Sequence, residues 1–281
     1  MPVPSRRAYH VIYDSSLEDA LEYASKNDWT GIVPDIGVPH FSPEKIVPKE
    51  RTKLHELAES LGIEWGFHAP GDDISLFSTY APVRAAIVEY FKEIIDFARD
   101  LSTGMTNVVI HSGKPPSFRK ANDIEDEFLS ENLSIYESTF FENVLDLVEY
   151  GRPDVNIVLE NHGWTPLLRY SIPSLIARGM RLCLDIPKLY DDSMQIKKSD
   201  WRVFQQFSET IEVVHLHDFH PKNGSHQILG VGNIDFTESL GLLNKMEHPP
   251  QYVFEVRPRE SATQSLASLR DILSNLNLTL L

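Results

Sequence analysis

Short apolar stretches alternate with longer amphipathic stretches along this chain. The short stretches have the alternating or continuous apolar pattern of buried strands, and the longer ones repeat apolar residues every three or four positions, as helices do. We predict strands at 8–14, 30–37, 63–70, 106–113, 155–163, 180–187, 211–219 and 251–258. We predict helices at 16–27, 50–62, 83–102, 131–151, 171–179, 199–209, 236–246 and 263–276.

Strand and helix thus alternate eight times, which is the pattern of a parallel βα fold. Eight such units close into a (β/α)8 barrel, the TIM barrel of the α/β class. No Pro-rich or Ser/Gly-rich linker divides the sequence, so we expect one domain over residues 1–281. The long segment at about 114–130 follows neither period, and we expect this insert to project over the barrel mouth.

Composition narrows the class of protein. The 281 residues are 42% hydrophobic and 24% charged, which is typical of a soluble globular protein. No apolar stretch approaches the roughly 18 to 20 residues of a membrane span, and the first residues lack the apolar region of a signal peptide. The single cysteine, Cys183, excludes an internal disulfide and fits a reducing cytoplasm. We therefore expect a cytoplasmic protein that does not associate with membranes.

The charge narrows the class of ligand. A formal net charge of −15 argues against binding of nucleic acid or anionic lipid, because phosphate binding needs a basic surface. We therefore expect a small-molecule substrate and no nucleic-acid partner. The sequence does not indicate the oligomeric state.

Candidate chemistry lies at the ends of the predicted strands, where the active sites of such barrels are built. Seven strands reach a carboxylate or an imidazole after an apolar run, and the first ends in Asp14. The seven residues are Asp35, His68, His111, Glu160, Asp185, His215 and Glu255. Such groups are costly to bury unless they are paired or bound to metal. The last six supply the nitrogen and oxygen ligands that zinc or manganese prefers.

Other residues near these ends have simpler interpretations. An aspartate that follows a strand commonly forms a turn or caps the next helix, so we expect one of these roles for Asp14 and Asp35. We expect His10 to be a packing or surface residue. By strand alternation, His217 points to the same side as His215, into the barrel mouth.

The strand ends resemble the motifs of the xylose isomerase-like barrel superfamily, which includes sugar isomerases and epimerases, inosose dehydratase-like proteins and endonuclease IV. The third to eighth strands carry "GFHAP", "VVIHSG", "IVLENHG", "LCLDIPK", "VVHLHD" with "HQILGVGNIDF", and "YVFEVRP". The resemblance runs from about residue 8 to residue 275. It implies a divalent metal (zinc, manganese or magnesium) on Glu160, Asp185, His215 and Glu255. It also implies a weaker second ion on His68, His111 and the shared Glu160.

The resemblance implies an isomerase or epimerase of a sugar, polyol or keto acid, which acts through an enediolate. Glu160 and Glu255 match the two carboxylates that move the proton. His217, His226 and Trp164 are candidate substrate contacts near the strand ends. Arg257 lies on the same side as Glu255. It either meets a carboxylate or phosphate of the substrate or pairs with an acidic neighbour.

Two positions depart from the nuclease branch of the superfamily. Lys188 stands where that branch has a histidine, and Gly224 stands where it has an aspartate. His226 would remain alone at the third metal, and one histidine cannot hold zinc. An endonuclease IV-like hydrolase is therefore an alternative, as is a barrel that binds a ligand without turnover. Lys188 either carries charge or a proton at the site or pairs with Asp191 or Asp192 at the surface.

Overall fold

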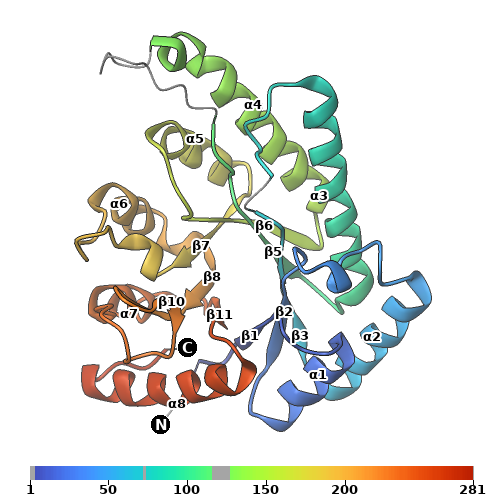
Figure 1. The fold of residues 1–281 in the computed structure, drawn as a ribbon, viewed down its shortest axis with the longest axis vertical. Helices are drawn as coiled ribbons and strands as arrows, with labels where there is room; N and C mark the ends of the chain where they lie inside the picture. Colours follow the sequence, from blue (N-terminus) through green and yellow to red (C-terminus); the bar gives the residue numbers. More distant parts are fainter. Residues whose placement is uncertain (1–3, 72–73, 116–126, 281) are drawn as a thin grey trace.

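The first strand, β1 (Arg7–Val11), pairs in parallel with both the second and the last strand of the main sheet, which closes it into a barrel (Figure 1). The computed structural model describes residues 4–71, 74–115 and 127–280. The strand order is β3-β2-β1-β11-β8-β7-β6-β5-β4. The other strands are β2 (Gly31–Pro34), β3 (Glu64–Trp65), β4 (Phe67–His68), β5 (Thr106–Ile110), β6 (Val155–Glu160), β7 (Arg181–Asp185), β8 (Ile211–Leu216) and β11 (Gln251–Phe254). The predicted TIM barrel is confirmed.

The third barrel strand is split at Gly66 into β3, which pairs with β2, and β4, which pairs with β5. The backbone N–H of Gly66 still donates to the carbonyl of Ile32 (3.0 Å), so the sheet continues through the break. A Cβ at Gly66 would lie 2.6 Å from Oε1 of Gln251 inside the barrel. Only glycine leaves room for that side chain.

The helices surround the barrel (Figure 1). They are α1 (Leu17–Lys26), α2 (Pro48–Leu61), α3 (Ala81–Leu101), α4 (Glu127–Gly151), α5 (Pro166–Ala177), α6 (Lys198–Gln206), α7 (Thr237–Leu243) and α8 (Arg259–Leu276). Helix α4 begins four residues earlier than predicted, so residues 127–130 of the expected insert belong to this helix. Residues 116–126 of the insert lie outside the described residues. Among the described helices, none combines the length and the apolarity that a membrane crossing requires.

The helix cap that we considered for Asp14 is wrong. Ser16 caps α1, because its side chain accepts the backbone N–H of Asp19. Asp14 instead accepts hydrogen bonds from the Tyr9 hydroxyl (3.0 Å) and from Nη1 of Arg259 (2.9 Å). Arg259 also binds Asp19 (2.8 Å). The start of α8 is thereby joined to the loop that follows β1.

The barrel interior is built in layers, because alternate residues of each strand point inward. One layer, the apolar layer, consists of Ala8, Val33, Val109, Val158, Cys183, Val213 and Val253, with Gly66 in the third strand. Two residues further along each strand lies the next layer, here called the ionisable layer: His10, Asp35, His68, His111, Glu160, Asp185, His215 and Glu255. The alternation thus brings all eight ionisable groups to the carboxyl end of the barrel.

A short hairpin follows β8 over this end of the barrel. Its strands β9 (Asp218–His220) and β10 (Gly224–Gln227) are antiparallel. The carboxylate of Asp218 accepts the backbone N–H groups of Gly230, Gly232 and Ile234 at 2.9 to 3.0 Å, which fixes the loop after the hairpin. The polar pattern of 224–227 gives no strand signal, so the hairpin was not predicted.

Candidate metal centre

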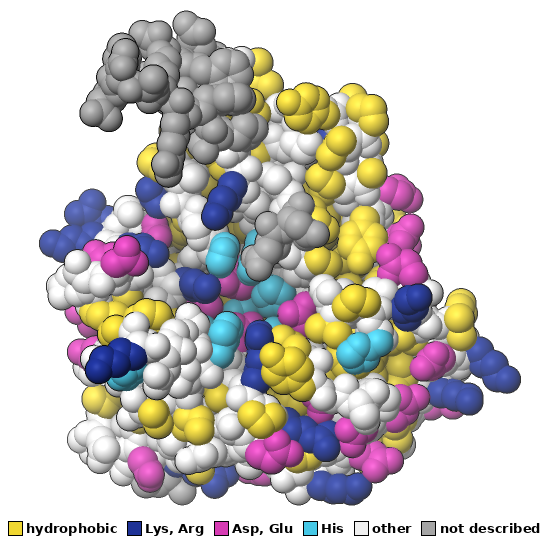
Figure 2. Space-filling model, in the orientation of Figure 1, with side chains coloured by type: hydrophobic (Ala, Val, Ile, Leu, Met, Phe, Trp, Pro, Cys, Tyr) yellow, Lys and Arg dark blue, Asp and Glu magenta, His cyan; other side chains and the backbone are white. Residues whose placement is uncertain are grey.

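The ionisable layer forms a compact group at the barrel mouth. Figure 2 shows histidine and acidic side chains gathered in a hollow at the centre of this face. Asp185 and His215 are fully buried, and Glu160 and Glu255 are 2% and 5% exposed. Carboxylates and imidazoles this far from water need partners of opposite charge or a bound cation.

His215 lies between the two glutamates that the sequence singles out. Its Nδ1 is 3.3 Å from Oε2 of Glu160 and 3.4 Å from Oε1 of Glu255. Asp185 is its register partner on β7, and ligand atoms of Asp185, His215 and Glu255 lie within 4.8 Å of one another. Neither ring nitrogen of the buried His215 has a hydrogen-bond partner. A divalent ion among these carboxylates would satisfy it, so the residues fit the expected metal.

The histidines of this group stabilise the charged form of the two glutamates. Burial alone would raise the pKa of the Glu160 carboxyl, but the charges of His111 and His215 hold it well below its usual value. Burial likewise opposes ionisation of Glu255, and His215 and His10 lower the pKa of that carboxyl. Both glutamates are therefore held as carboxylates, the form that binds metal.

His68 and His111 both approach Glu160, as the sequence predicts. Their Nε2 atoms lie 3.2 and 3.1 Å from its Oε2. Burial lowers the pKa of His68, but the hydrogen bond and charge of Glu160 outweigh that effect and raise it to about 9. The ring of His162 stacks on His111 with centroids 4.5 Å apart. A ring nitrogen of His162 lies within 4.8 Å of ligand atoms of His111 and Glu160, so His162 is a further candidate ligand.

Asp185 is held in place from several sides. The side chain of Asn161 accepts the backbone N–H of Asp185 (2.7 Å) and donates to its carbonyl (2.9 Å). Nε2 of the fully buried His217 lies 3.3 Å from Oδ2 of Asp185. The backbone N–H of Lys188 donates to Oδ1 (3.0 Å). Such outer partners orient a metal ligand.

The side chain of Lys188 has no ion pair with Asp191 or Asp192 within the described part of the chain. Instead, the carboxylate of Asp191 accepts two backbone N–H groups of its own loop, those of Ser193 and Gln195. The surface pairing that we considered for Lys188 is therefore not what the structure contains. Its action at the site stays a prediction.

The carbonyls of both glutamates are bound by side chains that we predicted to contact substrate. The indole N–H of Trp164 donates to the carbonyl of Glu160 (2.7 Å), and its ring stacks on Phe204. Nδ1 of His226, a residue with a positive φ of 61°, lies 2.8 Å from the carbonyl of Glu255. Trp164 and His226 therefore fix the backbone under the two carboxylates.

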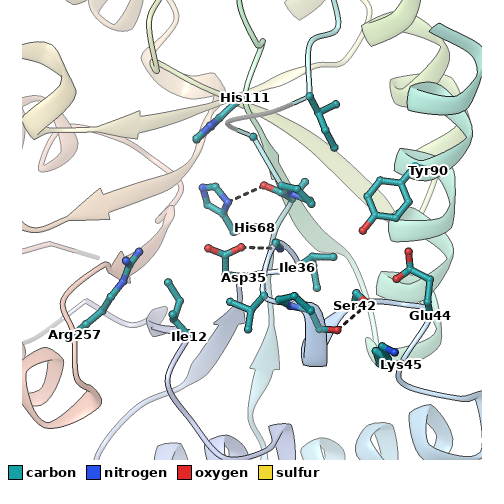
Figure 3. Close-up of a pocket in the computed structure, with 17 residues that line it drawn as sticks. Ile12, Asp35, Ile36, Ser42, Glu44, Lys45, His68, Tyr90, His111 and Arg257 are labelled. Atoms are coloured by element: carbon teal, nitrogen blue, oxygen red, sulfur yellow. Dashed lines mark hydrogen bonds between the residues drawn. The ribbon is translucent and has the colours of Figure 1, made fainter. Parts of the chain in front are cut away.

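A cavity of about 820 Å³ opens beside the ionisable layer (Figure 3). His68, His111, Asp35 and Arg257 lie at its inner side, and Tyr90 and Lys45 lie toward α2 and α3. The buried Nε of Arg257 has no hydrogen-bond partner, and this side chain forms no ion pair with the described residues. Pairing of Arg257 with an acidic neighbour is thus not observed, and its guanidinium faces the cavity.

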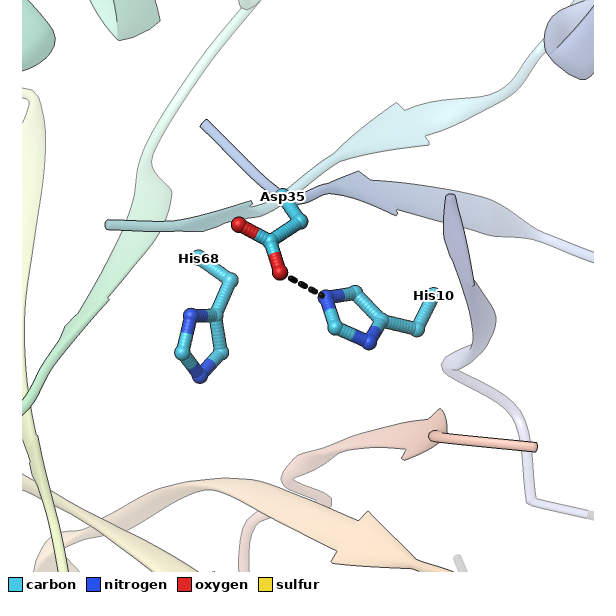
Figure 4. A group of neighbouring side chains, drawn as sticks. All are labelled: His10, Asp35 and His68. Atoms are coloured by element: carbon cyan, nitrogen blue, oxygen red, sulfur yellow. Dashed lines mark ion pairs between the residues drawn. The ribbon is translucent and has the colours of Figure 1, made fainter. Parts of the chain in front are cut away.

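His10 and Asp35 also belong to this group. From the sequence we expected His10 to pack or to lie at the surface, and Asp35 to form a turn or a helix cap. His10 is 4% exposed at the mouth rather than at the surface. Its Nδ1 lies 3.5 Å from Oε1 of Glu255, and its Nε2 lies 3.7 Å from Oδ2 of Asp35 (Figure 4). Asp35 forms the turn that its place after a strand suggests, because its Oδ1 accepts the backbone N–H of Gly37. The sequence does contain a signal that places His10 and Asp35 at the mouth, because they lie two residues after Ala8 and Val33, whose side chains point into the barrel.

Comparison with known proteins places the chain in a family. Residues 21–272 match the family described as xylose isomerase-like TIM barrel. The uncharacterized protein MJ1311 of Methanocaldococcus jannaschii is 26% identical over 238 residues, which cover 82% of this chain and 77% of that protein.

Solved structures share the fold at low identity. A D-tagatose 3-epimerase-like protein is 22% identical, with a TM-score of 0.72 over 97% of this chain and 98% of its own. D-psicose 3-epimerase in the presence of D-fructose is 13% identical, with a TM-score of 0.70 over 96% and 99%. The TTHB071 protein from Thermus thermophilus, soaked with ZnCl2, is 20% identical, with a TM-score of 0.66 over 96% and 98%. The chain belongs to the xylose isomerase-like TIM barrel family.

Proposed function

We propose that the protein is a divalent-metal-dependent epimerase or isomerase of a small sugar, polyol or keto acid. The observation that carries this proposal is the convergence of two buried glutamates on one centre. Glu160 on β6 and Glu255, just after β11, reach Nδ1 of His215 at 3.3 and 3.4 Å. Two carboxylates that approach one centre from different strands suit removal of a proton from one face of a carbon and its return to the other. The 3-epimerase names of several solved neighbours agree with this chemistry.

Glu160, Asp185, His215 and Glu255 would hold the ion. The imidazole among three carboxylates favours zinc or manganese over magnesium. When bound, the metal supplies positive charge that stabilises the negative oxygens of the substrate. Asn161 and His217 keep Asp185 oriented toward the centre.

The two glutamates carry the proton. One carboxylate accepts the proton from the carbon beside the substrate carbonyl, the C–H electron pair moves into a C=C bond, and the carbonyl oxygen becomes negative. A proton returned to the opposite face of that carbon re-forms the carbonyl and gives the epimer. A proton returned to the former carbonyl carbon gives the isomer, provided that the neighbouring hydroxyl passes its proton to the former carbonyl oxygen and becomes the new carbonyl. Trp164 and His226 hold the backbones of the two glutamates, so that the carboxylates keep their relative position.

The remaining predicted residues fit a polar substrate. Arg257 faces the cavity without a partner, which suits a carboxylate or phosphate on the substrate. His217 and His226 present imidazole rings beside Glu255. Lys188 follows Asp185 closely enough to add a positive charge at the mouth.

Proton exchange tests the proposal directly. The zinc- or manganese-loaded protein is incubated in D2O with D-fructose, D-psicose, D-tagatose and a 2-keto sugar acid, and deuterium on carbon is followed by NMR. We expect incorporation with at least one of them. Glu160→Gln and Glu255→Gln should each lower its rate by about 10²- to 10⁴-fold, because each removes a proton carrier.

Glu89→Gln is the matched control, because Glu89 is an exposed glutamate on the outside of α3. It should exchange at the wild-type rate. Exchange that survives both active-site substitutions would contradict the proposal, as would the absence of exchange with every compound.

A further inference from the structure

We propose that His10, Asp35 and His68 form a second cation site, for a transition-metal ion of the zinc class, on the β1–β4 side of the barrel mouth. The three residues come from adjacent strands of the barrel, and their side chains converge (Figure 4). The site is separate from the group of Glu160, Asp185, His215 and Glu255. It uses two residues to which the sequence assigns no ligand role.

The distances suit a zinc ion after a small closure. One ligand atom from each residue lies within 4.8 Å of the other two, and Nε2 of His10 is 3.7 Å from Oδ2 of Asp35. Tetrahedral zinc with bonds of about 2.0 to 2.1 Å separates neighbouring ligand atoms by roughly 3.3 Å. The His10–Asp35 pair is therefore only slightly wider than a bound ion requires.

The state of His10 indicates a missing ligand. The side chain is 4% exposed, yet neither ring nitrogen has a hydrogen-bond partner. Among the described residues, His215 has the same combination, and it lies at the centre of the other group. A proton on Nδ1 of His10 would face Oε1 of Glu255, 3.5 Å away, and leave the lone pair of Nε2 toward Asp35. A carboxylate behind an imidazole in this way is the usual support of a metal-bound histidine.

The cavity supplies the remaining coordination position. Asp35 and His68 both line the 820 Å³ cavity (Figure 3). Three protein ligands with an open fourth position describe a zinc site that is accessible to water or to a ligand. An oxygen of a molecule in the cavity would have direct access to the ion.

The charge of the ionisable layer can accommodate a second divalent ion. Glu160, Asp185 and Glu255 carry −3 as carboxylates, and Asp35 brings the sum to (−3) + (−1) = −4. Two divalent ions give (−4) + 2 + 2 = 0. With one ion alone, the carboxylates and the ion carry −2, and the cationic His68 and Arg257 would have to balance that charge.

The site competes with the second metal position that the sequence suggests, which consists of His68, His111 and Glu160. Nδ1 of His68 faces the carbonyl of Ala69 at 3.0 Å, so Nε2 is the nitrogen left to bind an ion. Nε2 lies 3.2 Å from Oε2 of Glu160, so the ring would have to turn away from Glu160 to bind an ion between His10 and Asp35. A single lone pair serves one ion only. Variants of His10 and Asp35 on one side and of His111 on the other therefore distinguish the two positions.

The test is zinc stoichiometry, measured by plasma mass spectrometry after loading with zinc chloride and desalting. We expect two zinc ions per wild-type chain, and one in His10→Phe and in the isosteric Asp35→Asn. His111→Gln is the matched control and should keep two. A wild-type chain that binds one ion overturns the proposal. So does a second ion that is retained without His10 and Asp35 or lost in His111→Gln.

Anomalous diffraction at the zinc edge from wild-type crystals needs no variant. It should give a peak between His10, Asp35 and His68, and a second peak only beside Glu160 and His111 would refute the site. Neither measurement depends on turnover. Failure of this site therefore leaves the proposed epimerase chemistry untouched, and failure of that chemistry leaves the stoichiometry unchanged.

Discussion

The apolar layer and the ionisable layer of the barrel are one inward step apart on every strand, yet they have opposite chemistry. Val213 and Cys183, for example, are fully buried apolar side chains, and His215 and Asp185 lie directly above them. The apolar layer excludes water from below, so the charges above it act through a medium of low polarity. The apolar floor of the site therefore contributes to its electrostatics, as the ligands do.

The two layers should therefore respond to different perturbations. The apolar layer buries no charged side chain, so it needs no bound ion. The ionisable layer holds several carboxylates together away from water, which costs free energy of solvation. A bound cation should compensate for most of that free energy. The predictions below separate the layers in order of decreasing expected effect.

The largest effect should come from metal. At a free metal concentration roughly 1,000 times Kd, zinc or manganese should raise the free energy of unfolding by about 4 kcal/mol over chelated protein. Urea unfolding with metal and with EDTA measures the difference. Asp185→Ala should lose this gain, because it removes a ligand, and an equal gain in that variant would refute the assigned site.

A smaller effect is expected from a polar atom in the apolar layer. Val213→Thr keeps the shape of the side chain but buries a hydroxyl, which should lower the free energy of unfolding by about 1 to 3 kcal/mol and leave the metal content unchanged. Val231→Thr is the matched control, because Val231 is 59% exposed, and it should have almost no effect. Equal stability of the two variants in urea would show that the layer tolerates polar groups.

The smallest effect is expected at Cys183. The thiol is fully buried in the apolar layer, two residues before Asp185. Cys183→Ala should cost roughly 1 kcal/mol through a small cavity and should bind as much metal as the wild type. Reduced metal content in this variant would mean that the sulfur takes part in the site and that the two layers are not separate.

Most of the barrel follows from sequence periodicity. Each predicted strand overlaps an observed one, because the apolar runs are long enough to mark a buried strand on their own. Helix starts are less well predicted: α8 begins at Arg259 rather than at 263. The contact of Arg259 with Asp14, which ties that first turn to the β1 loop, comes from 245 positions away and leaves no local signal.

The site is predictable where a polar residue ends an apolar run. This identifies Glu160 and His215, which lie together as expected. In the first strand the same criterion identified Asp14 and missed His10. His10 lies two residues after the inward-facing Ala8, so its side chain points into the barrel as well. Whether Arg257 forms an ion pair depends on its distance in space from each acidic side chain. The sequence does not give these distances.

Closure of the barrel between β1 and β11 has a consequence for synthesis of the chain. Arg7 is the register partner of Tyr252, so the two edges that meet are 245 residues apart. Until β11 has left the ribosome, β1 presents an open strand edge to other chains. Contacts of such long sequence separation also form slowly. We therefore expect the nascent chain to be most prone to aggregation just before its last strand emerges, when seven strands of the barrel already expose a continuous edge.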